Sequence, residues 1–188
     1  MRELGIGEAL VGNLGLIAPA RSAGFDIRGD FGLNVFNSHT LQVLADAGLR
    51  SATASFEMRL GQVRDLVKCL DTELIVYGRL PLMVSEQCII KTSGGGCSCE
   101  TGAALSDRTG SIFPIVKEPG CRNVILNAHK LFLADKVADL RECGLWAGRL
   151  MFTTESPREC ALLAKAYKGM NDYRPNGLTR GLYYRGVE

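Results

Sequence analysis

The sequence lacks any segment suited to a membrane. Its first residues, Met1–Gly7, contain no apolar signal core, and no later apolar run is long enough to cross a bilayer. We therefore expect a soluble, cytoplasmic protein without a membrane partner. An excess of charge of one sign is also absent, because 22 Lys and Arg residues face 20 Asp and Glu residues. The resulting net charge of +2 neither indicates nor excludes binding to nucleic acid.

Histidine is scarce, and this limits the catalytic classes open to the chain. The 2 histidines are His39 and His129, and the sequence contains neither a Gly-x-Ser-x-Gly elbow nor a His-Glu-x-x-His helix. The usual parts of a serine hydrolase or a zinc metallopeptidase are therefore missing. We interpret His39, beside an expected helix start, as a surface or capping residue, and His129 likewise. A cysteine peptidase could use Cys88, but the sequence places no histidine near it.

Cysteine is present in 7 copies, an odd number that cannot all pair internally. Four of these residues fall in one stretch, and they are Cys88, Cys97, Cys99 and Cys121. Thiolates suit zinc and iron–sulfur clusters, which both commonly take four of them, so this stretch predicts a metal site. The spacing is not that of paired Cys-x-x-Cys zinc knuckles, and two alternatives stay open. The thiols could be small hydrophobic side chains, or Cys88 and Cys121 could form a disulfide, which a reducing cytosol disfavours.

Strand-like and helix-like segments alternate along the chain. The strand-like segments are 8–13, 25–35, 51–55, 74–77 and 149–153, and the helix-like segments are 16–23, 38–47, 60–70, 131–143 and 156–168. This alternation predicts an α/β fold of about five βα units, either an open parallel sheet or a partial βα barrel. An insertion at 81–126 carries the cysteine loop and a β-hairpin, in which 105–116 pairs with 121–126. Residues 1–172 form the expected domain, and 173–188 form a tail rich in Arg, Gly and Tyr.

Polar side chains follow several of the expected strands, where open α/β sheets and βα barrels bind their ligands. The candidate substrate-binding residues are Asp30, Asn34, Asn37, Ser55, Glu57 and Arg79. The guanidinium of Arg79 could grip a carboxylate or phosphate in bidentate fashion. A structural role is equally open: Asn37 and Ser55 could cap helices, and Arg79 could pair with Glu57 or Asp30.

Several motifs resemble those of one known family. They are Glu73-x-Ile-Val-Tyr-Gly-Arg-Leu-Pro-Leu-Met-Val-Ser-Glu-Gln-Cys88, Leu105-x-Asp-Arg-x-Gly-x-x-Phe-Pro114, Asp30-x-x-Leu-Asn-Val-Phe-Asn-Ser38, Cys121-Arg-Asn-Val-Ile-Leu-Asn127 and Thr179-Arg-Gly-Leu-Tyr-Tyr-Arg-Gly-Val187. The chain resembles the collagenase-like peptidases of family U32 over nearly its whole length. The resemblance implies a βα barrel, of which this chain is the C-terminal part.

The same resemblance implies two kinds of activity. The family is named for proteolysis, but other members resemble hydroxylation enzymes that act on tRNA, rRNA or ubiquinone precursors and carry a four-iron cluster on four cysteines. By position, Cys88 and Cys121 match two of those ligands, and Cys97 or Cys99 matches a third. The remaining family cysteine falls at Pro81 here, so a four-thiol set requires both Cys97 and Cys99.

Three hypotheses follow for function: an iron–sulfur hydroxylation enzyme, a peptidase, or a non-catalytic half-barrel that works only as an assembly partner. The substrate could be RNA or a peptide, and zinc is the alternative to the iron–sulfur cluster. An open arc of strands would leave an unpaired edge and uncovered apolar faces. We therefore expect a homodimer, or another subunit that completes the barrel, unless residues after Thr153 fold back over the open side.

Overall fold

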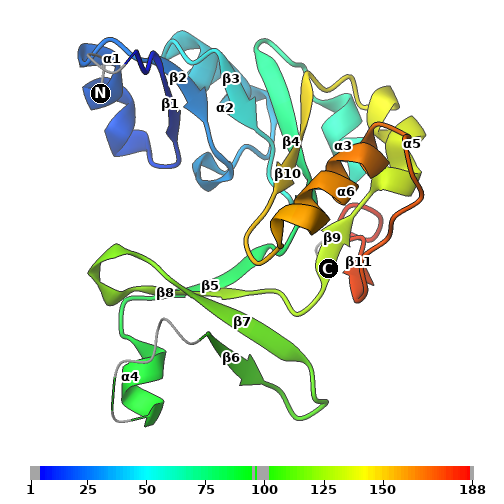
Figure 1. The fold of residues 1–188 in the computed structure, drawn as a ribbon. Coiled ribbons are helices and arrows are strands. Elements are labelled where there is room, and N and C mark those ends of the chain that lie inside the picture. Colours follow the sequence, from blue (N-terminus) through cyan, green and yellow to red (C-terminus); the bar gives the residue numbers. More distant parts are fainter. Residues whose placement is uncertain (1–4, 95, 97–101, 187–188) are drawn as a thin grey trace. The chain divides into compact units, whose positions relative to one another are not determined.

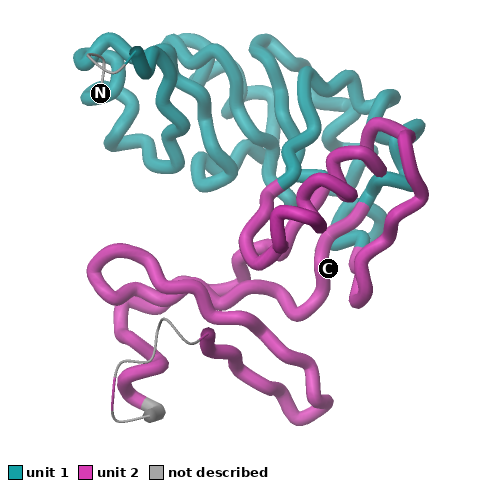
Figure 2. Tube along the Cα trace, viewed as in Figure 1, with its two compact units in different colours: residues 1–76, 133–150, 180–188 teal, residues 77–132, 151–179 magenta. Residues whose placement is uncertain are grey.

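The structure is a computed structural model that describes residues 5–94, 96 and 102–186 of the 188-residue chain. Its contacts divide the chain into two compact units, each built from separate stretches of sequence (Figure 2). Unit 1 comprises Met1–Val76, Leu133–Leu150 and Arg180–Glu188, and unit 2 comprises Tyr77–Phe132 and Met151–Thr179. None of the helices in these described ranges is long and apolar enough to cross a membrane.

Unit 1 is built on parallel strands with helices between them (Figure 1). The strands are β1 (Glu8–Val11), β2 (Asp26–Gly29), β3 (Ser51–Thr53) and β4 (Asp71–Gly78), paired in that order and all parallel, and β10 (Ala147–Met151) pairs with β4. The α-helices are α1 (Ile17–Ser22), α2 (Ser38–Asp46), α3 (Leu60–Asp65) and α5 (Val137–Glu142), and short 3₁₀ turns are η2 (Leu14–Leu16), η3 (Phe31–Leu33) and η5 (Ala134–Lys136). The expected α/β class with a parallel-rich sheet is confirmed. Over the described residues the strands do not close into a barrel.

Local sequence signals explain where the elements of unit 1 begin and end. Asn37 is the N-cap of α2, and its side-chain oxygen accepts a hydrogen bond from the Thr40 N–H at 2.9 Å. The chain leaves α2 through Gly48, whose φ of +84° is a conformation that favours glycine. Leu41 and Leu44, on one face of α2, are fully buried, which gives the unit a continuous apolar core.

Unit 2 contains a short strand where the sequence predicted a helix. The predicted helix over 131–143 is wrong at its start, because β9 (Lys130–Phe132) is a strand and α5 begins only at Val137. Tyr77 and Gly78, at the end of β4, pair antiparallel with Phe132 and Leu131, and this pairing decides the conformation. β11 (Leu178–Thr179) pairs parallel with β9. α6 (Pro157–Tyr167) lies within the helix-like segment 156–168 and begins with a capping box formed by Ser156 and Glu159.

A second, antiparallel sheet occupies the insertion at 81–126. Its strands are β5 (Pro81–Ser85), β6 (Ala103–Ser106), β7 (Ile112–Lys117) and β8 (Asn123–Leu126), in the order β5-β8-β7-β6, with α4 (Ile89–Gly94) and the 3₁₀ turn η4 (Pro119–Cys121) beside them. The predicted hairpin is confirmed in part. β7 pairs antiparallel with β8, whereas Leu105 and Ser106, at the start of the predicted first strand, belong to β6 and pair with β7. The first residues of the insertion, Pro81–Ser85, form a strand that pairs with β8, so the cysteine loop begins only after Ser85.

The segment predicted as a tail packs onto unit 1 at its C-terminal end. Tyr183 is 1% exposed, and its hydroxyl donates a hydrogen bond of 2.6 Å to the carbonyl oxygen of Ile75. Arg180 forms a two-pronged ion pair with Asp135, with N···O distances of 2.6 Å. These contacts tie residues 180–183 to the core of unit 1, while the domain bounds 1–172 and 173–188 stay a prediction.

Candidate functional site

A charged cluster lies across the strands of unit 1, and its centre is Arg149 of β10. The guanidinium forms ion pairs with Asp30, directly after β2, and with Glu73 of β4. It also donates a hydrogen bond of 2.9 Å to the hydroxyl oxygen of Thr53 in β3. That hydroxyl lies 2.9 Å from Glu73 Oε1 and can donate to it. We call Asp30, Thr53, Glu73 and Arg149 the Arg149 cluster.

Strand register explains why these four side chains meet. Thr53 and Glu73 are direct partners in the β3–β4 pair, so their side chains leave the sheet on the same face. The charged side chains of Arg149, Asp30 and Glu73 are only 19%, 23% and 16% exposed. Two carboxylates therefore share one guanidinium in a partly desolvated setting. The Arg149 cluster ties the parallel strands together, and it occupies the carboxylate of Asp30.

The other strand-end candidates in unit 1 have local structural contacts. Asn34 ends η3 in the left-handed conformation with φ 50°, and Asn37 caps α2. Ser55 is buried, and its hydroxyl oxygen accepts a hydrogen bond from the backbone N–H of Glu57 at 3.3 Å. The Glu57 side chain belongs to an exposed residue. The structure therefore gives Asn37 the capping role that the sequence left open, and a substrate contact by these residues stays a prediction.

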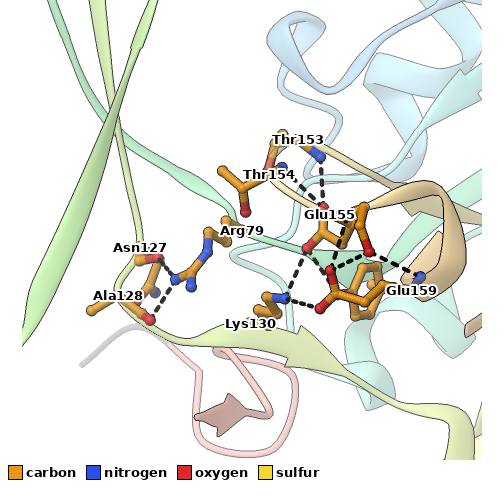
Figure 3. Close-up of polar contacts among 10 residues, drawn as sticks. Arg79, Asn127, Ala128, Lys130, Thr153, Thr154, Glu155 and Glu159 are labelled. Atoms are coloured by element: carbon orange, nitrogen blue, oxygen red, sulfur yellow. Dashed lines mark hydrogen bonds and ion pairs between the residues drawn. The ribbon is translucent and has the colours of Figure 1, made fainter. Parts of the chain in front are cut away.

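Arg79, the sixth candidate, belongs to unit 2 and is tethered to backbone oxygens (Figure 3). Its Nη1 donates to the carbonyl oxygen of Asn127 at 2.8 Å and to that of Ala128. Its Nε is buried, and no hydrogen-bond acceptor reaches it from the described residues. The Arg79 guanidinium therefore fixes the connection between β8 and β9.

Close to Arg79, unit 2 contains a second charged cluster that sequence reasoning missed (Figure 3). The Glu155 side chain is 0% exposed, and its Oε1 lies 3.3 Å from Lys130 Nζ and accepts a hydrogen bond of 2.9 Å from the Tyr77 hydroxyl. Its Oε2 accepts backbone N–H groups of Thr153 at 2.8 Å and Thr154 at 3.1 Å. Lys130 also lies 3.7 Å from Glu159. We call Tyr77, Lys130, Glu155 and Glu159 the Glu155 cluster.

Glu155 and Tyr77, which are hydrogen-bonded within the Glu155 cluster, both have shifted pKa values. Burial opposes ionisation of Glu155, but the N–H of Thr153, the Tyr77 hydroxyl and Lys130 outweigh it and hold the pKa of this carboxyl below its usual value. Burial and the bond to Glu155 raise the pKa of the Tyr77 hydroxyl well above its usual range. Tyr77 therefore stays a proton donor, and Glu155 stays an ionised acceptor.

Two of the predicted metal-binding cysteines lie at the same end of the second sheet. Ser85, three residues before Cys88, pairs with Asn123, two residues after Cys121. Asn123 is 0% exposed, and its Oδ1 accepts a hydrogen bond of 2.7 Å from the N–H of Ile89. The amide of Asn123 therefore links the segments that carry Cys88 and Cys121.

The described residues alone do not contain a complete metal site. Cys97 and Cys99 lie outside the described residues. Cys88 and Cys121 are free thiols, and no group of three or more His, Cys, Asp and Glu side chains suited to a metal ion occurs among residues 5–94, 96 and 102–186. Cys143 is buried, and this burial raises the pKa of its thiol.

A cavity of about 470 Å³ in unit 1 lies apart from all the predicted site residues. Its lining includes Arg59, Gln62, Arg64, Asp139, Cys143 and Tyr184. Acidic and basic groups both line it, and the Tyr184 hydroxyl donates a hydrogen bond to Asp139. The cavity therefore shows no preference for a ligand of one charge.

The missed residues left only a weak signal in the sequence. Glu73 and Arg149 are charged residues at the start of apolar strand-like segments, 74–77 and 149–153, where a charge indicates pairing within a sheet. Glu155 directly precedes the capping box at Ser156, so it resembles an ordinary helix-start carboxylate. The partners of these residues lie far away in sequence, 119 positions for Arg149 and Asp30 and 78 for Tyr77 and Glu155.

Comparison with protein families gives one match: the model of peptidase family U32 matches residues 1–180, nearly the whole chain. Neither the curated proteins nor the solved structures contain a match to this sequence.

Proposed function

Because the chain belongs to peptidase family U32, we propose that it is an iron–sulfur enzyme of the hydroxylating kind. In this proposal Cys88, Cys97, Cys99 and Cys121 hold a four-iron cluster, and zinc on the same thiolates is the alternative. The family name alone points to a collagenase-like peptidase, which is the second candidate. A third is a half-barrel without catalysis.

The observation that carries the proposal is the register of β5 and β8. The pairing of Ser85 with Asn123 brings the backbone segments of Cys88 and Cys121 to one end of a rigid strand pair. The hydrogen bond from the N–H of Ile89 to Asn123 fixes the start of α4, directly after Cys88. A cluster needs its ligands within a few ångströms of one another, and this arrangement supports two of the four.

The surroundings of the two thiols fit a metal ligand better than a packing residue. Cys121 is exposed and Cys88 is partly exposed, whereas cysteines that only fill a core are buried. The backbone N–H of Lys91 lies 3.5 Å from Cys88 Sγ and donates to it. Hydrogen bonds to ligand sulfurs tune the potential of an iron–sulfur cluster.

When bound, a four-iron cluster supplies electron transfer beside the substrate. The chain's own residues would hold and orient that substrate, and we propose Asp30, Asn34, Asn37, Ser55, Glu57 and Arg79 for this role. Arg79 can do so because two backbone carbonyls already fix its guanidinium. The proposed substrate is RNA or a peptide.

Peptide hydrolysis by a nucleophile has less support in the described residues. His39 and His129 are both exposed, and within the described ranges neither imidazole hydrogen-bonds a serine or cysteine side chain. A nucleophilic mechanism requires such a pair. Release of peptides from gelatin or casein by the purified protein, abolished in Cys88→Ser, would favour the peptidase.

We also propose that unit 1 is part of a βα barrel completed by a second copy or another subunit. β1 pairs with β2, and no other strand of the described residues pairs with β1. Leu10 of β1 is 55% exposed. An unpaired edge beside an exposed apolar side chain supports a missing neighbour at β1.

The proposal is tested by metal analysis of protein purified without air. We expect iron and acid-labile sulfide in equal amounts, with visible charge-transfer absorbance, in the wild-type protein. Cys88→Ser and Cys121→Ser should lose most of both, whereas Cys69→Ser, which removes an exposed thiol of unit 1, should lose neither. Full iron in the Cys88→Ser/Cys121→Ser double variant would overturn the proposal, and stoichiometric zinc without colour would favour a structural zinc site.

A further inference from the structure

We propose that the Nε–Nη2 edge of the Arg79 guanidinium binds the carboxylate group of an organic ligand. The proposal rests on the substrate-holding role proposed above for Arg79, and it does not require the iron–sulfur cluster. Nη1 of this guanidinium donates hydrogen bonds to the carbonyl oxygens of Asn127 and Ala128. Within the described residues Nε is buried without an acceptor, and Nη2 has none either. Two adjacent donors of the same guanidinium are therefore unused.

Arg79 is also a cation without a counter-ion. Among the residues that the structure describes, no Asp or Glu side chain pairs with it, and the partners of Nη1 are neutral carbonyl oxygens. The carboxylates of Glu155 and Glu159 lie 3.3 and 3.7 Å from Lys130 instead (Figure 3). Arg79 is partly buried, and a charge that water solvates incompletely favours a bound ion of opposite sign. The unused edge therefore favours an anion.

Arg79 lies where α/β folds bind their ligands. It follows Gly78, the last residue of β4, and Met151 is the last residue of β10. A Cβ atom on Gly78 would collide with the carbonyl oxygen of Met151, so the ends of the two strands are in contact. Open α/β sheets and βα barrels bind ligands at the carboxyl ends of their strands. Thr154, in the loop after β10, adds an exposed hydroxyl that has no hydrogen-bond partner in the described ranges.

The hydrogen bonds of Nη1 orient the unused edge before a ligand arrives. The connection that supplies the two carbonyl oxygens is itself fixed. The N–H of Asn127 donates to the carbonyl oxygen of Leu80 at 2.9 Å, and Asn127 Oδ1 accepts the N–H of His129 at 3.0 Å. A guanidinium that is already oriented loses little conformational freedom when it binds an anion.

The shape of the edge favours a carboxylate over a phosphate. The N–H groups of Nε and Nη2 are parallel and lie in the plane of the guanidinium, where the two oxygen atoms of a carboxylate can meet them. Nη2 is open to solvent and gives access to the edge, whereas the buried Nε leaves little room above and below its end. A phosphate group has further oxygen atoms outside this plane. We therefore choose a carboxylate, and the phosphate of an RNA backbone is the competing outcome of the test.

Nuclear magnetic resonance of the arginine Nε–H groups in the full-length protein tests the proposal. The probe is N-acetylglycine, which carries one carboxylate, and the neutral control is N-acetylglycinamide. We expect N-acetylglycine to shift the Nε–H resonance of Arg79, assigned by triple-resonance spectra, in a saturable way, and the amide to leave it unchanged. Dimethyl phosphate, which represents the RNA backbone, should bind at least about tenfold more weakly than N-acetylglycine.

Two arginine variants show whether the edge itself binds the probe. Arg79→Lys keeps the charge but removes the pair of parallel donors, so the Kd for N-acetylglycine should rise at least about tenfold. The control Arg180→Lys changes a guanidinium that is already paired with Asp135 through both Nη atoms, and it should leave the Kd unchanged. The Arg79 resonance of the wild type decides the question even where Arg79→Lys does not fold. No saturable shift, equal or tighter binding of dimethyl phosphate, or equal losses in the two variants would each overturn the proposal.

Cys88→Ser separates this proposal from that of the iron–sulfur enzyme. This variant removes a proposed metal ligand and leaves the Arg79 edge intact, so N-acetylglycine should bind it with the Kd of the wild type. A wild-type protein that contains iron but does not bind N-acetylglycine would overturn the carboxylate site alone. A wild-type protein that binds N-acetylglycine but contains no iron after purification without air would overturn the iron–sulfur proposal alone.

Discussion

Replacing Arg149 by methionine tests whether the Arg149 cluster holds the strands of unit 1 together. Methionine keeps most of the volume of the side chain, but it leaves Asp30 and Glu73 without their shared cation. Breaking a fully buried ion pair costs about 3–5 kcal/mol, and an exposed pair contributes about 0–1 kcal/mol. The three charged side chains are 16–23% exposed, so we expect a loss of about 3 kcal/mol in the free energy of unfolding.

Urea denaturation followed by circular dichroism measures this loss, and thermal melting provides a second measurement. For a chain of this size, a loss of about 3 kcal/mol lowers the melting temperature by about 6–12 °C. The matched control is Arg50→Met, which breaks the ion pair between Arg50 and Asp26 at 3.1 Å, where the side chains are 59% and 47% exposed. This control should cost less than about 1 kcal/mol.

A second substitution separates lost charge pairing from lost packing. Glu73→Gln in the Arg149→Met background removes one uncompensated carboxylate and should recover at least about 1 kcal/mol. Equal losses in Arg149→Met and Arg50→Met, or no recovery in the double variant, would refute the electrostatic account of the cluster.

Three further predictions concern unit 2. Tyr77→Phe removes the hydroxyl that is hydrogen-bonded to Glu155, and urea titrations should show that it lowers the free energy of unfolding by about 1.5–3 kcal/mol. The control Tyr184→Phe changes a more exposed position and should lower the free energy of unfolding by less than half as much. The folded-state pKa of Glu155 lies below the unfolded value near 4.5, so the contribution of Glu155 to stability is complete above that pH and is lost as the pH falls through the folded-state pKa. Glu155→Gln should therefore reduce the loss of stability that the wild type shows at acidic pH. An unchanged loss at acidic pH would contradict a stabilising role of the Glu155 carboxylate. Asn123→Ala should lower the iron content without removing a ligand, because it frees the start of α4 directly after Cys88. The control Asn127→Ala removes a comparable bond to the His129 N–H at 3.0 Å and should retain the iron.

Local patterns in the sequence were sufficient to predict most of unit 1. The alternation of strand-like and helix-like segments predicted its parallel strands, and the Asn37 cap and Gly48 stop of α2 lie where sequence rules place them. The error at Leu131 has a physical reason. An apolar run of this length fits a strand or a helix equally well, and pairing of Leu131 and Phe132 with β4 decides between them.

The candidate site was harder to predict, because its residues depend on contacts that sequence order does not reveal. Asp30 was named as a candidate, but its partner Arg149 lies 119 positions away, on a strand that reads as buried. Glu155 and Lys130 were missed for the same reason, since each looks like a helix-start or loop charge until β9 and α6 are brought together. The pairing of strands, rather than the composition of any segment, creates both clusters.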